Sequence, residues 1–258
     1  MSDTLQLLLA YKTAIVLAVF VLFFAAERFR PAVLAPAGRL WQRLVRNLGL
    51  SAINFVLSPL IVVPSAALAA GLAPSWRPEW WSGGYGLLLD LLIMDCAIYW
   101  MHRANHTFDF LWRFHRVHHL DEHLDTTSGL RFHFGEVLIS AGFRVAFIIA
   151  TDMPIESVIV FEALLLLASL FHHSNTRLPA TVEKAVNLII VTPSIHRVHH
   201  HADPKDLRSN MATVLSVWDR LFGSRSATAD SRDLNLGVPG ERDLSLPELI
   251  VRPVRPPD

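Results

Sequence analysis

The sequence predicts an all-α integral membrane protein with about four spanning helices or helical hairpins and a cytoplasmic histidine-rich helical cap. Of its 258 residues, 52% are hydrophobic and only 18% are charged, whereas soluble domains carry about 25% charged residues. Several apolar runs approach or exceed the roughly 20 residues that a helix needs to cross a bilayer. All thirteen histidines follow the third of these runs. We therefore expect them to gather at one end of the helices.

The first two apolar runs predict two spanning helices. Residues 5–26 contain one charged residue, Lys12, and residues 48–72 contain none. We expect the first run to remain as a spanning helix, because it is too long for a signal peptide and lacks a small-residue cleavage site. Pro59 and Pro64 should kink the second helix, which spanning helices tolerate.

The later apolar runs predict a third helix and a helical hairpin. Residues 85–101 form the third helix, which carries Asp90 and Asp95. For Asp90 we expect a role in helix packing. Residues 136–150 and 155–171 are separated by the sequence TDMP and are interpreted as the two arms of a hairpin. Because these arms are short for full spans, a re-entrant hairpin is an alternative.

The arginines predict the orientation of these helices. The loop at residues 27–47 holds five arginines, whereas the loop at 73–84 holds one arginine and three tryptophans. Cytoplasmic loops carry an excess of basic residues, and tryptophan favours membrane interfaces. The first loop is therefore predicted to be cytoplasmic and the second external. The third helix then runs towards the cytoplasm, so residues 102–135 and the chain after residue 172 are expected on that side.

The histidines fall into closely spaced clusters. These clusters are His102 and His106; His115, His118 and His119; His172 and His173; and His196, His199 and His200. Residues three or four apart share one face of a helix, so their imidazoles can reach the same ion. Adjacent histidines such as His118 and His119 diverge enough to serve two ions. The joint pattern predicts one shared metal site at a single membrane face.

The residue types limit which metal and which protein class fit this site. Imidazole suits zinc, copper, iron and nickel, and a structural zinc site needs only four ligands. Nine or ten histidines suffice for two ions with open positions. The single cysteine, Cys96, excludes disulfides and cysteine-based zinc sites. Lys and Arg balance Asp and Glu at 23 each, so nothing indicates a nucleic-acid partner.

Two other protein classes remain alternatives at this point. A membrane metal-binding or metal-transport protein would need polar residues through the bilayer. A b-type haem protein would use histidine pairs on facing helices inside the membrane. The clustering of the histidines at one face, three and four residues apart, favours two closely spaced ions over both alternatives.

Two long stretches of the chain carry specific motifs. Residues 95–136 contain D-x6-H-x3-H, H-x2-H-H and R-x-H, and residues 171–224 contain H-S-N, a second H-x2-H-H and N-x7-W-D-R-L-F-G. These motifs resemble the fatty acid hydroxylase/sterol desaturase superfamily of membrane-bound di-iron oxygenases. The resemblance divides the chain into N-terminal transmembrane helices at 1–84, a catalytic domain at 85–224, and a polar proline-rich tail at 225–258.

The resemblance implies a set of metal ligands. They are His102, His106, His115, His118, His119, His173, His196, His199 and His200, with His133 as a tenth. His172 stands where other members often have glutamine, so we expect it beside the ligands or neutral in role. His123 and His201 lie outside the motifs and are expected to be exposed to solvent.

Other residues are predicted to orient the ligands. A metal-bound imidazole usually donates its other N–H to a carboxylate or carbonyl. Asp95 lies two helical turns before His102 and is expected to orient a histidine, as is Asn175. Weaker candidates are Asp121, Asp125, Glu136, Asn210 and Asp219. Departures from the commonest family residues occur at Met101, Met211 and Phe134, which are not ligand positions and leave the identity of the substrate open.

The resemblance also implies the chemistry. We expect two iron ions, for which zinc could substitute in a purified sample, and O₂-dependent oxidation of a fatty acyl, sterol or isoprenoid chain. Hydroxylation is favoured, with desaturation as the alternative outcome. The sequence has no cysteine-rich iron–sulfur motif and no G-x-G-x-x-G motif after a strand. A separate electron donor, a ferredoxin or a cytochrome b5-like protein with its reductase, is therefore predicted.

The last segment of the chain differs in composition from the rest. Residues 225–258 are polar and rich in proline. We expect a loosely ordered tail, in which the sequence LSLPELI at 244–250 packs on the preceding domain.

Overall fold

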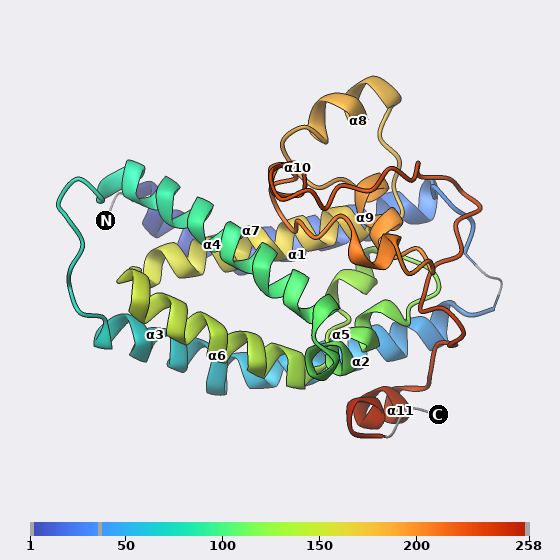
Figure 1. The fold of residues 1–258 in the computed structure, drawn as a ribbon, viewed down its shortest axis with the longest axis horizontal. Coiled ribbons are helices and arrows are strands. Elements are labelled where there is room, and N and C mark those ends of the chain that lie inside the picture. Colours follow the sequence, from blue (N-terminus) through green and yellow to red (C-terminus); the bar gives the residue numbers. More distant parts are fainter. Residues whose placement is uncertain (1–2, 36–37, 256–258) are drawn as a thin grey trace.

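Long helices lying side by side dominate the structure, a computed structural model that describes residues 3–35 and 38–255, without the side chains of residues 3–9. The long helices are α1 (Asp3–Phe29), α2 (Leu40–Leu57), α3 (Val63–Leu72), α4 (Gly83–Thr107), α6 (Phe134–Thr151) and α7 (Ile155–His173). Figure 1 shows them running along the long axis of the molecule. Among the described residues, β structure is limited to isolated bridges, so the all-α prediction is confirmed.

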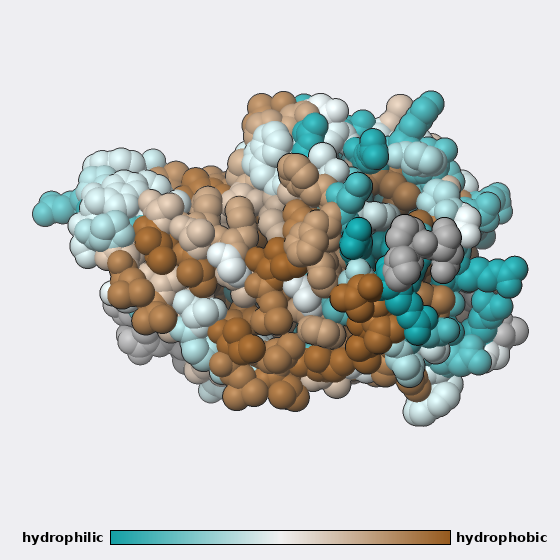
Figure 2. All heavy atoms as spheres, turned by 60° about the horizontal axis from the view of Figure 1, so that its bottom comes forward, coloured by the Kyte–Doolittle hydropathy of each residue, from teal (hydrophilic) through white to brown (hydrophobic). Residues whose placement is uncertain are grey.

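Five of these helical segments are long and apolar enough to cross a membrane. They are Ala10–Phe29, Leu40–Leu72, Gly83–Thr107, Phe134–Thr151 and Ile155–His173. In an apolar 18-residue stretch of each of the first two segments, only 6% of the residues are buried inside the protein. Figure 2 shows the hydrophobic side chains spread over the long helices and hydrophilic ones gathered at one end. The exposed apolar surface fits a lipid environment, and the chain is an integral membrane protein.

The second segment is continuous but changes its helical form. A π-helical turn at Ser58–Val62 joins α2 to α3, with Pro59 near its start and Pro64 near the start of α3. Proline lacks the N–H that would continue the α-helical hydrogen bonds. The irregularity that the prolines predicted is therefore a π turn.

The predicted hairpin arms form two full helices with different neighbours. α6 packs against α3, whereas α7 packs against α1 and α4. The turn between them has Asp152 in the left-handed conformation, with φ 51°. Met94 and Ile98 of α4, Ile148 of α6 and Phe161 of α7 belong to one buried apolar cluster. This core holds α4 in place, and the last turns of α4 carry the first histidines.

Asp90 has the packing role that the sequence predicted for it. It is buried, and its carboxylate accepts hydrogen bonds from the Arg77 guanidinium, from Trp81 Nε1 at 3.0 Å and from Ser157 Oγ at 2.6 Å. An aspartate within an apolar segment is costly unless it is paired. Asp90 thus ties α4 to α7 and to the tryptophan-rich loop, at the end of the bundle away from the histidines.

Short helices cover the opposite end of the bundle. They are α5 (Asp109–His119), α8 (Ala180–Val186), α9 (Pro193–His199), α10 (Val217–Leu221) and α11 (Leu246–Val251), with 3₁₀ turns η2 (Thr126–Leu130), η3 (Asp206–Arg208) and η4 (Arg252–Val254). We refer to this part of the chain as the cap. It gathers around the carboxyl-terminal halves of α4 and α7, with α8 and α10 on one side of the bundle (Figure 1).

The C-terminal segment corrects one prediction. We expected a loosely ordered tail, but the described residues up to 255 are built into the cap. Leu249 of α11 is fully buried against Leu50 and Val117. Asp243 accepts hydrogen bonds from Arg131 at 2.5 Å and from Arg46 at 2.8 Å. The packing of LSLPELI, which the sequence predicted, is confirmed, and these ion pairs order the residues before it.

A buried charge cluster holds the loop after α5 against α2. Arg43 is 5% exposed, and its guanidinium pairs with Asp121 and, at 3.1 Å, with Asp125. Asn47 also donates to Asp121, at 3.2 Å. Taking these charges out of water is costly unless each one keeps its partner. The cluster therefore fixes the loop at 120–131 to the bundle.

Replacing Arg43 by methionine should destabilise the protein strongly. Asp121 loses the cation it pairs with, and Asp125 keeps only Arg28, at 3.6 Å. Breaking a buried pair in this way costs about 3–5 kcal/mol, and the unfolding temperature in detergent should fall by about 10 °C. Arg39→Met is the matched control, because the Arg39–Glu122 pair is exposed, with side chains 61% and 38% accessible. It should cost less than about 1 kcal/mol. Equal losses for the two variants would contradict the role of the buried cluster.

Candidate metal centre

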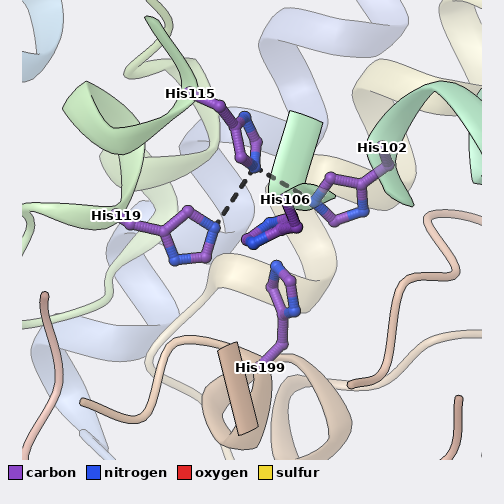
Figure 3. Close-up of side chains that lie close together, drawn as sticks. All are labelled: His102, His106, His115, His119 and His199. Carbon is purple, nitrogen blue, oxygen red and sulfur yellow. Dashed lines mark hydrogen bonds between the residues drawn. The ribbon is translucent and has the colours of Figure 1, made fainter. Parts of the chain in front are cut away.

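Five histidines from three helices converge in the cap. They are His102 and His106 of α4, His115 and His119 of α5, and His199 of α9. One nitrogen from each ring lies within 4.8 Å of one nitrogen of every other ring, and all five residues are buried. Figure 3 shows the rings pointing towards one another from the separate helices. We call this set the five-histidine group.

Four more histidines form a second group of the same kind. They are His118 of α5, His173 at the end of α7, His196 of α9 and His200 directly after it. Their nitrogens also lie within 4.8 Å of one another, and all four are buried. We call this set the four-histidine group.

Neighbouring residues supply one ligand to each group. His118 and His119 have rings at an interplanar angle of 90°, and His199 and His200 have rings at 86°. The rings of each pair therefore diverge, as we predicted for residues 118 and 119. The His119 and His200 rings stack with centroids 4.2 Å apart, so the two groups adjoin each other.

Hydrogen bonds determine which nitrogen of several rings carries the proton. A carbonyl oxygen can only accept, so a ring nitrogen bonded to it must be the N–H. Such bonds run from Nδ1 of His102 to Met211 O (2.8 Å), His118 to Arg131 O (3.1 Å), His173 to Ser169 O (2.8 Å) and His199 to Ser209 O (2.8 Å). In these neutral rings Nε2 is therefore an unprotonated lone-pair donor.

A carboxylate has the same effect on a fifth ring. His115 Nδ1 donates a hydrogen bond to Glu136 Oε1 at 2.7 Å. Asn105 Nδ2 donates to the same oxygen at 3.3 Å. Glu136 thus turns the lone pair of His115 Nε2 towards the five-histidine group. The sequence placed Glu136 only among its weaker candidates.

The lone pairs of these rings face one another at short distances. Nε2 of His118 lies 3.0 Å from Nε2 of His173, and Nε2 of His102 lies 3.1 Å from Nε2 of His115. Two unprotonated nitrogens cannot share a hydrogen bond. Two imidazoles bound to one ion at right angles, each about 2.1 Å from it, would have their nitrogens about 3 Å apart. The spacing therefore fits a cation in each group.

Buried nitrogens without a hydrogen-bond partner also indicate a bound cation. His106 Nε2 and His199 Nε2 are buried and have no hydrogen-bond partner among the described residues. A buried polar atom without a partner costs about 1–3 kcal/mol. A bound metal ion would satisfy both lone pairs, so the residues present fit a metal ion.

Burial keeps the imidazoles of the two histidine groups neutral, which is the form that binds metal ions. Desolvation lowers the pKa of His199 to about 3, and it lowers the pKa of His118, His119, His196 and His200 well below the usual value. Neighbouring imidazoles reinforce the effect, because two adjacent imidazolium ions would repel each other. Metal ions bind the neutral ring.

His133 is not brought into either group. Its Nδ1 accepts from Gly135 N at 2.9 Å, and its Nε2 donates to Ile250 O at 2.9 Å. The ring therefore caps the start of α6 and joins it to α11. Because both nitrogens are engaged elsewhere, the structure does not support our sequence-based expectation of a tenth ligand.

The two residues expected to orient ligands have other partners. Asp95 accepts from Leu215 N at 3.0 Å and from Trp218 Nε1 at 2.7 Å. Asn175 exchanges hydrogen bonds with the backbone N–H and C=O of Val33, at 2.9 and 2.7 Å. Asp95 therefore holds the segment before α10, and Asn175 holds the chain after α1. Neither contacts a histidine of the two groups.

The weaker candidates other than Glu136 influence the grouped histidines only indirectly, through the segments that they hold in place. Asp219 accepts from Met211 N at 2.6 Å, and the Met211 carbonyl accepts from His102. Asn210 Nδ2 donates to Ile195 O at 3.0 Å, between α9 and the following loop. Asp121 and Asp125 belong to the Arg43 cluster. These residues place the backbone that the ligands contact.

The remaining histidines have structural positions. The ring of His172 packs on that of His196 with centroids 4.1 Å apart, which agrees with its expected place beside the ligands. His123 was expected to be exposed, but it is 6% exposed and accepts from Asn175 at 3.4 Å. His201 is partly buried and pairs with Asp206 at 2.7 Å. The expectation of exposure is wrong for His123 and inaccurate for His201.

Trp112 is a residue that the sequence reasoning missed. Its ring centroid lies 5.1 Å from that of His106 and 5.5 Å from that of His119. It is half-buried and covers one side of the five-histidine group. The signal was present, since residues 112, 115 and 119 are spaced to share one face of a helix.

The geometry of the cap agrees with a comparison between this chain and a known family. A model of the fatty acid hydroxylase family matches residues 87–224, more than half of the chain and the region that supplies all nine grouped histidines. This chain belongs to the fatty acid hydroxylase family. The resemblance seen in the sequence is thereby confirmed.

Relatives of this fatty acid hydroxylase family member include named lipid-modifying enzymes. An ornithine lipid hydroxylase from Rhizobium tropici is 26% identical over 185 residues, which cover 71% of this chain and 54% of that protein. An alkylglycerol monooxygenase from Danio rerio is 32% identical over 150 residues, which cover 58% of this chain and 32% of that protein. The human alkylglycerol monooxygenase is 29% identical over 147 residues, with 57% and 32% covered.

These matches cover only part of the relatives. The aligned region spans about half of the ornithine lipid hydroxylase and about a third of the alkylglycerol monooxygenases. No solved structure matches the chain.

Replacing Glu136 by glutamine should weaken metal binding at the five-histidine group. The carboxylate fixes the His115 tautomer, and loss of such a partner typically lowers metal affinity about 10–100-fold. Metal retained per chain during titration with a chelator measures the change. Glu79→Gln, in the exposed tryptophan-rich loop, is the control and should behave like the wild type. Unchanged affinity in Glu136→Gln would show that the contact does not matter for metal binding.

The metal-free protein should lose stability as the pH falls below about 6.5. The unfolded chain takes up protons near that pH, whereas burial holds the pKa of His199 at about 3 and keeps the pKa of the other cap ligands low. Protonation thus favours unfolding, and the stability present above pH ~6.5 is lost towards pH ~3. Thermal unfolding measured between pH 7 and about pH 5.5 tests this before carboxylates titrate. A constant or rising unfolding temperature would refute it.

Proposed function

We propose that this protein is an O₂-dependent di-iron oxygenase that hydroxylates an apolar chain of a membrane lipid. The observation that carries the proposal is the pair of adjoining histidine groups, with five and four buried ligands. Lone pairs face one another in both groups at a spacing that a bound cation would satisfy. Membership of the fatty acid hydroxylase family supports a lipid substrate.

The donor set and the relatives together favour iron. Neutral imidazole also suits zinc, copper and nickel, but a closed structural zinc site needs only four ligands. Relatives are named as a hydroxylase and as monooxygenases, names that denote oxidation chemistry, and zinc has no redox chemistry of its own. Zinc could still replace iron in a purified sample.

The protein's own residues would hold and shield the irons. The five-histidine group would hold one iron and the four-histidine group the other, and together they would supply the O₂ activation needed to oxidise an unactivated C–H bond. Glu136 and the backbone carbonyls of Met211, Arg131, Ser169 and Ser209 keep the ligand tautomers fixed. Burial of all nine ligands excludes bulk water from the site.

The substrate class follows from the position of the site. Three of the nine ligands lie near the ends of α4 and α7, two helices that are long and apolar enough to cross a membrane. A lipid chain in the bilayer can therefore approach the site from the side of the bundle. The two kinds of relative are named for an ornithine lipid and for alkylglycerol. Their names favour hydroxylation over desaturation, with a fatty acyl, sterol or isoprenoid chain as the group that reacts.

The electron donor and the membrane orientation complete the proposal. The chain carries no recognisable flavin, nicotinamide or iron–sulfur motif, so a separate ferredoxin or cytochrome b5-like protein with its reductase would deliver electrons. The arginine-rich loop at 27–47 supports a cytoplasmic location for the cap. A soluble donor could then reach the site directly.

Comparative lipidomics tests the function. Membranes of cells that express the protein should contain a lipid that has gained one oxygen atom, and cells with a His119→Ala variant should lack it. A product with two hydrogen atoms fewer would indicate desaturation. Transport of metal ions by reconstituted vesicles without any lipid product would favour the metal-transport alternative and contradict the proposal.

Alanine variants test the ligand assignment. His119→Ala and His199→Ala should each abolish turnover and lower the iron content, because each removes a member of the five-histidine group. His201→Ala is the control, since His201 pairs with Asp206 and contacts neither group. It should keep both activity and iron. Equal losses in all three variants would show that the assignment is wrong.

A further inference from the structure

Part of the cap exposes large apolar side chains outside the five candidate spans. In and after α8, Val182, Leu188 and Ile189 are 43%, 60% and 64% exposed. In α10, Val217 and Leu221 are 39% and 65% exposed. A cluster of exposed apolar groups outside the lipid-facing helices marks a further binding surface.

The two segments form one continuous surface, which we call the lobe (residues 177–190 and 213–225). Ser216 N donates to Ile189 O at 3.0 Å, and Ser216 Oγ donates to Asn187 O at 2.6 Å. An antiparallel bridge also joins residues 190 and 215. Figure 1 shows α8 projecting from the body on the side of α10. The apolar side chains are therefore held together on a fixed backbone.

The lobe lies beside α4, within the length of that spanning helix. The Phe222 ring packs on Trp100 with centroids 5.0 Å apart, and Trp218 Nε1 donates to Asp95 at 2.7 Å. With a rise of 1.5 Å per residue, Trp100 and Asp95 lie roughly 10 and 18 Å before the end of α4. Trp100 is itself 47% exposed. The lobe thus continues the lipid-facing surface of α4 instead of lying beyond it.

The charges of the lobe differ between its surface and its interior. The exposed charged residues are all basic: Arg177, Lys184, Arg220 and Arg225. The two acidic residues are turned inward, since Glu183 accepts from Ser194 and Thr192, and Asp219 is fully buried. Apolar side chains bordered by basic ones are typical of segments that lie in the headgroup region of an anionic membrane.

We propose that the lobe inserts into the leaflet on the histidine side of the membrane and contacts the phosphates of anionic lipids. Its apolar side chains would lie among the upper acyl chains, with the basic side chains at headgroup level. Residue 190 leads within three residues to α9, which carries His196 and His199. The lobe would therefore set the depth of the histidine groups relative to the lipid. That consequence for catalysis rests on the proposed function, whereas the insertion does not.

Site-specific fluorescence tests the insertion. In a Cys96→Ser background, which lacks the only cysteine, the variants Leu188→Cys and Leu221→Cys are labelled with an environment-sensitive probe. Each is reconstituted in nanodiscs of equal parts phosphatidylcholine and phosphatidylglycerol. Lys205→Cys, at an exposed cap position outside the lobe, is the control. Acyl-chain nitroxides should quench the two lobe probes, and aqueous iodide should quench only the control.

The opposite pattern would overturn the proposal. Lobe probes that are open to iodide in the nanodisc would show that lipid does not cover this surface and would favour a soluble protein partner instead.

The contribution of lipid charge is tested with the same probes. Quenching at position 188 should weaken in pure phosphatidylcholine, and Arg177→Gln with Lys184→Gln should remove this lipid dependence. Equal quenching of the unaltered lobe in both lipids would refute contact with anionic headgroups. None of these readouts depends on enzyme activity.

Discussion

The structure of the cap depends on a set of imidazole lone pairs that face one another in its buried interior. Nδ1 donates to a carbonyl or carboxylate in five of the nine grouped rings, which leaves Nε2 unprotonated and pointing inward. Such lone pairs repel one another unless a cation lies between them. A metal ion would therefore stabilise the folded cap as well as serve catalysis, and the apoprotein carries that unfavourable contact in its core.

The surrounding polar contacts support this arrangement from the outside. Asp219 holds the backbone at Met211, whose carbonyl orients His102. The Arg43 cluster holds the loop that leads to Arg131, whose carbonyl orients His118. Most of these partners are backbone atoms or lie far from the histidines in sequence. A change several residues away from a ligand can therefore alter metal affinity without touching the metal site.

The same helices connect the polar centre to the lipid. α4 is apolar enough to span a membrane, yet it supplies two histidines at one end and anchors the proposed lobe through Asp95 and Trp100. A lipid chain alongside α4 would thus lie near both the site and the lobe. This arrangement reconciles a dense cluster of polar ligands with a chain that is 52% hydrophobic.

The sequence by itself determined the helical spans and the presence of a shared histidine site, because span length and the spacing of three and four residues are local properties of a helix. The set of nine ligands came from the resemblance to a known family. Only the tertiary structure decided how the histidines divide between the five-histidine and the four-histidine group, since this depends on how α5 and α9 approach each other and α4. It also decided that Glu136 orients His115, whereas Asp95 and His133 bond to other segments. Partners from distant segments cannot be inferred from helix spacing. The burial of His123 and of the C-terminal segment was missed for the same reason.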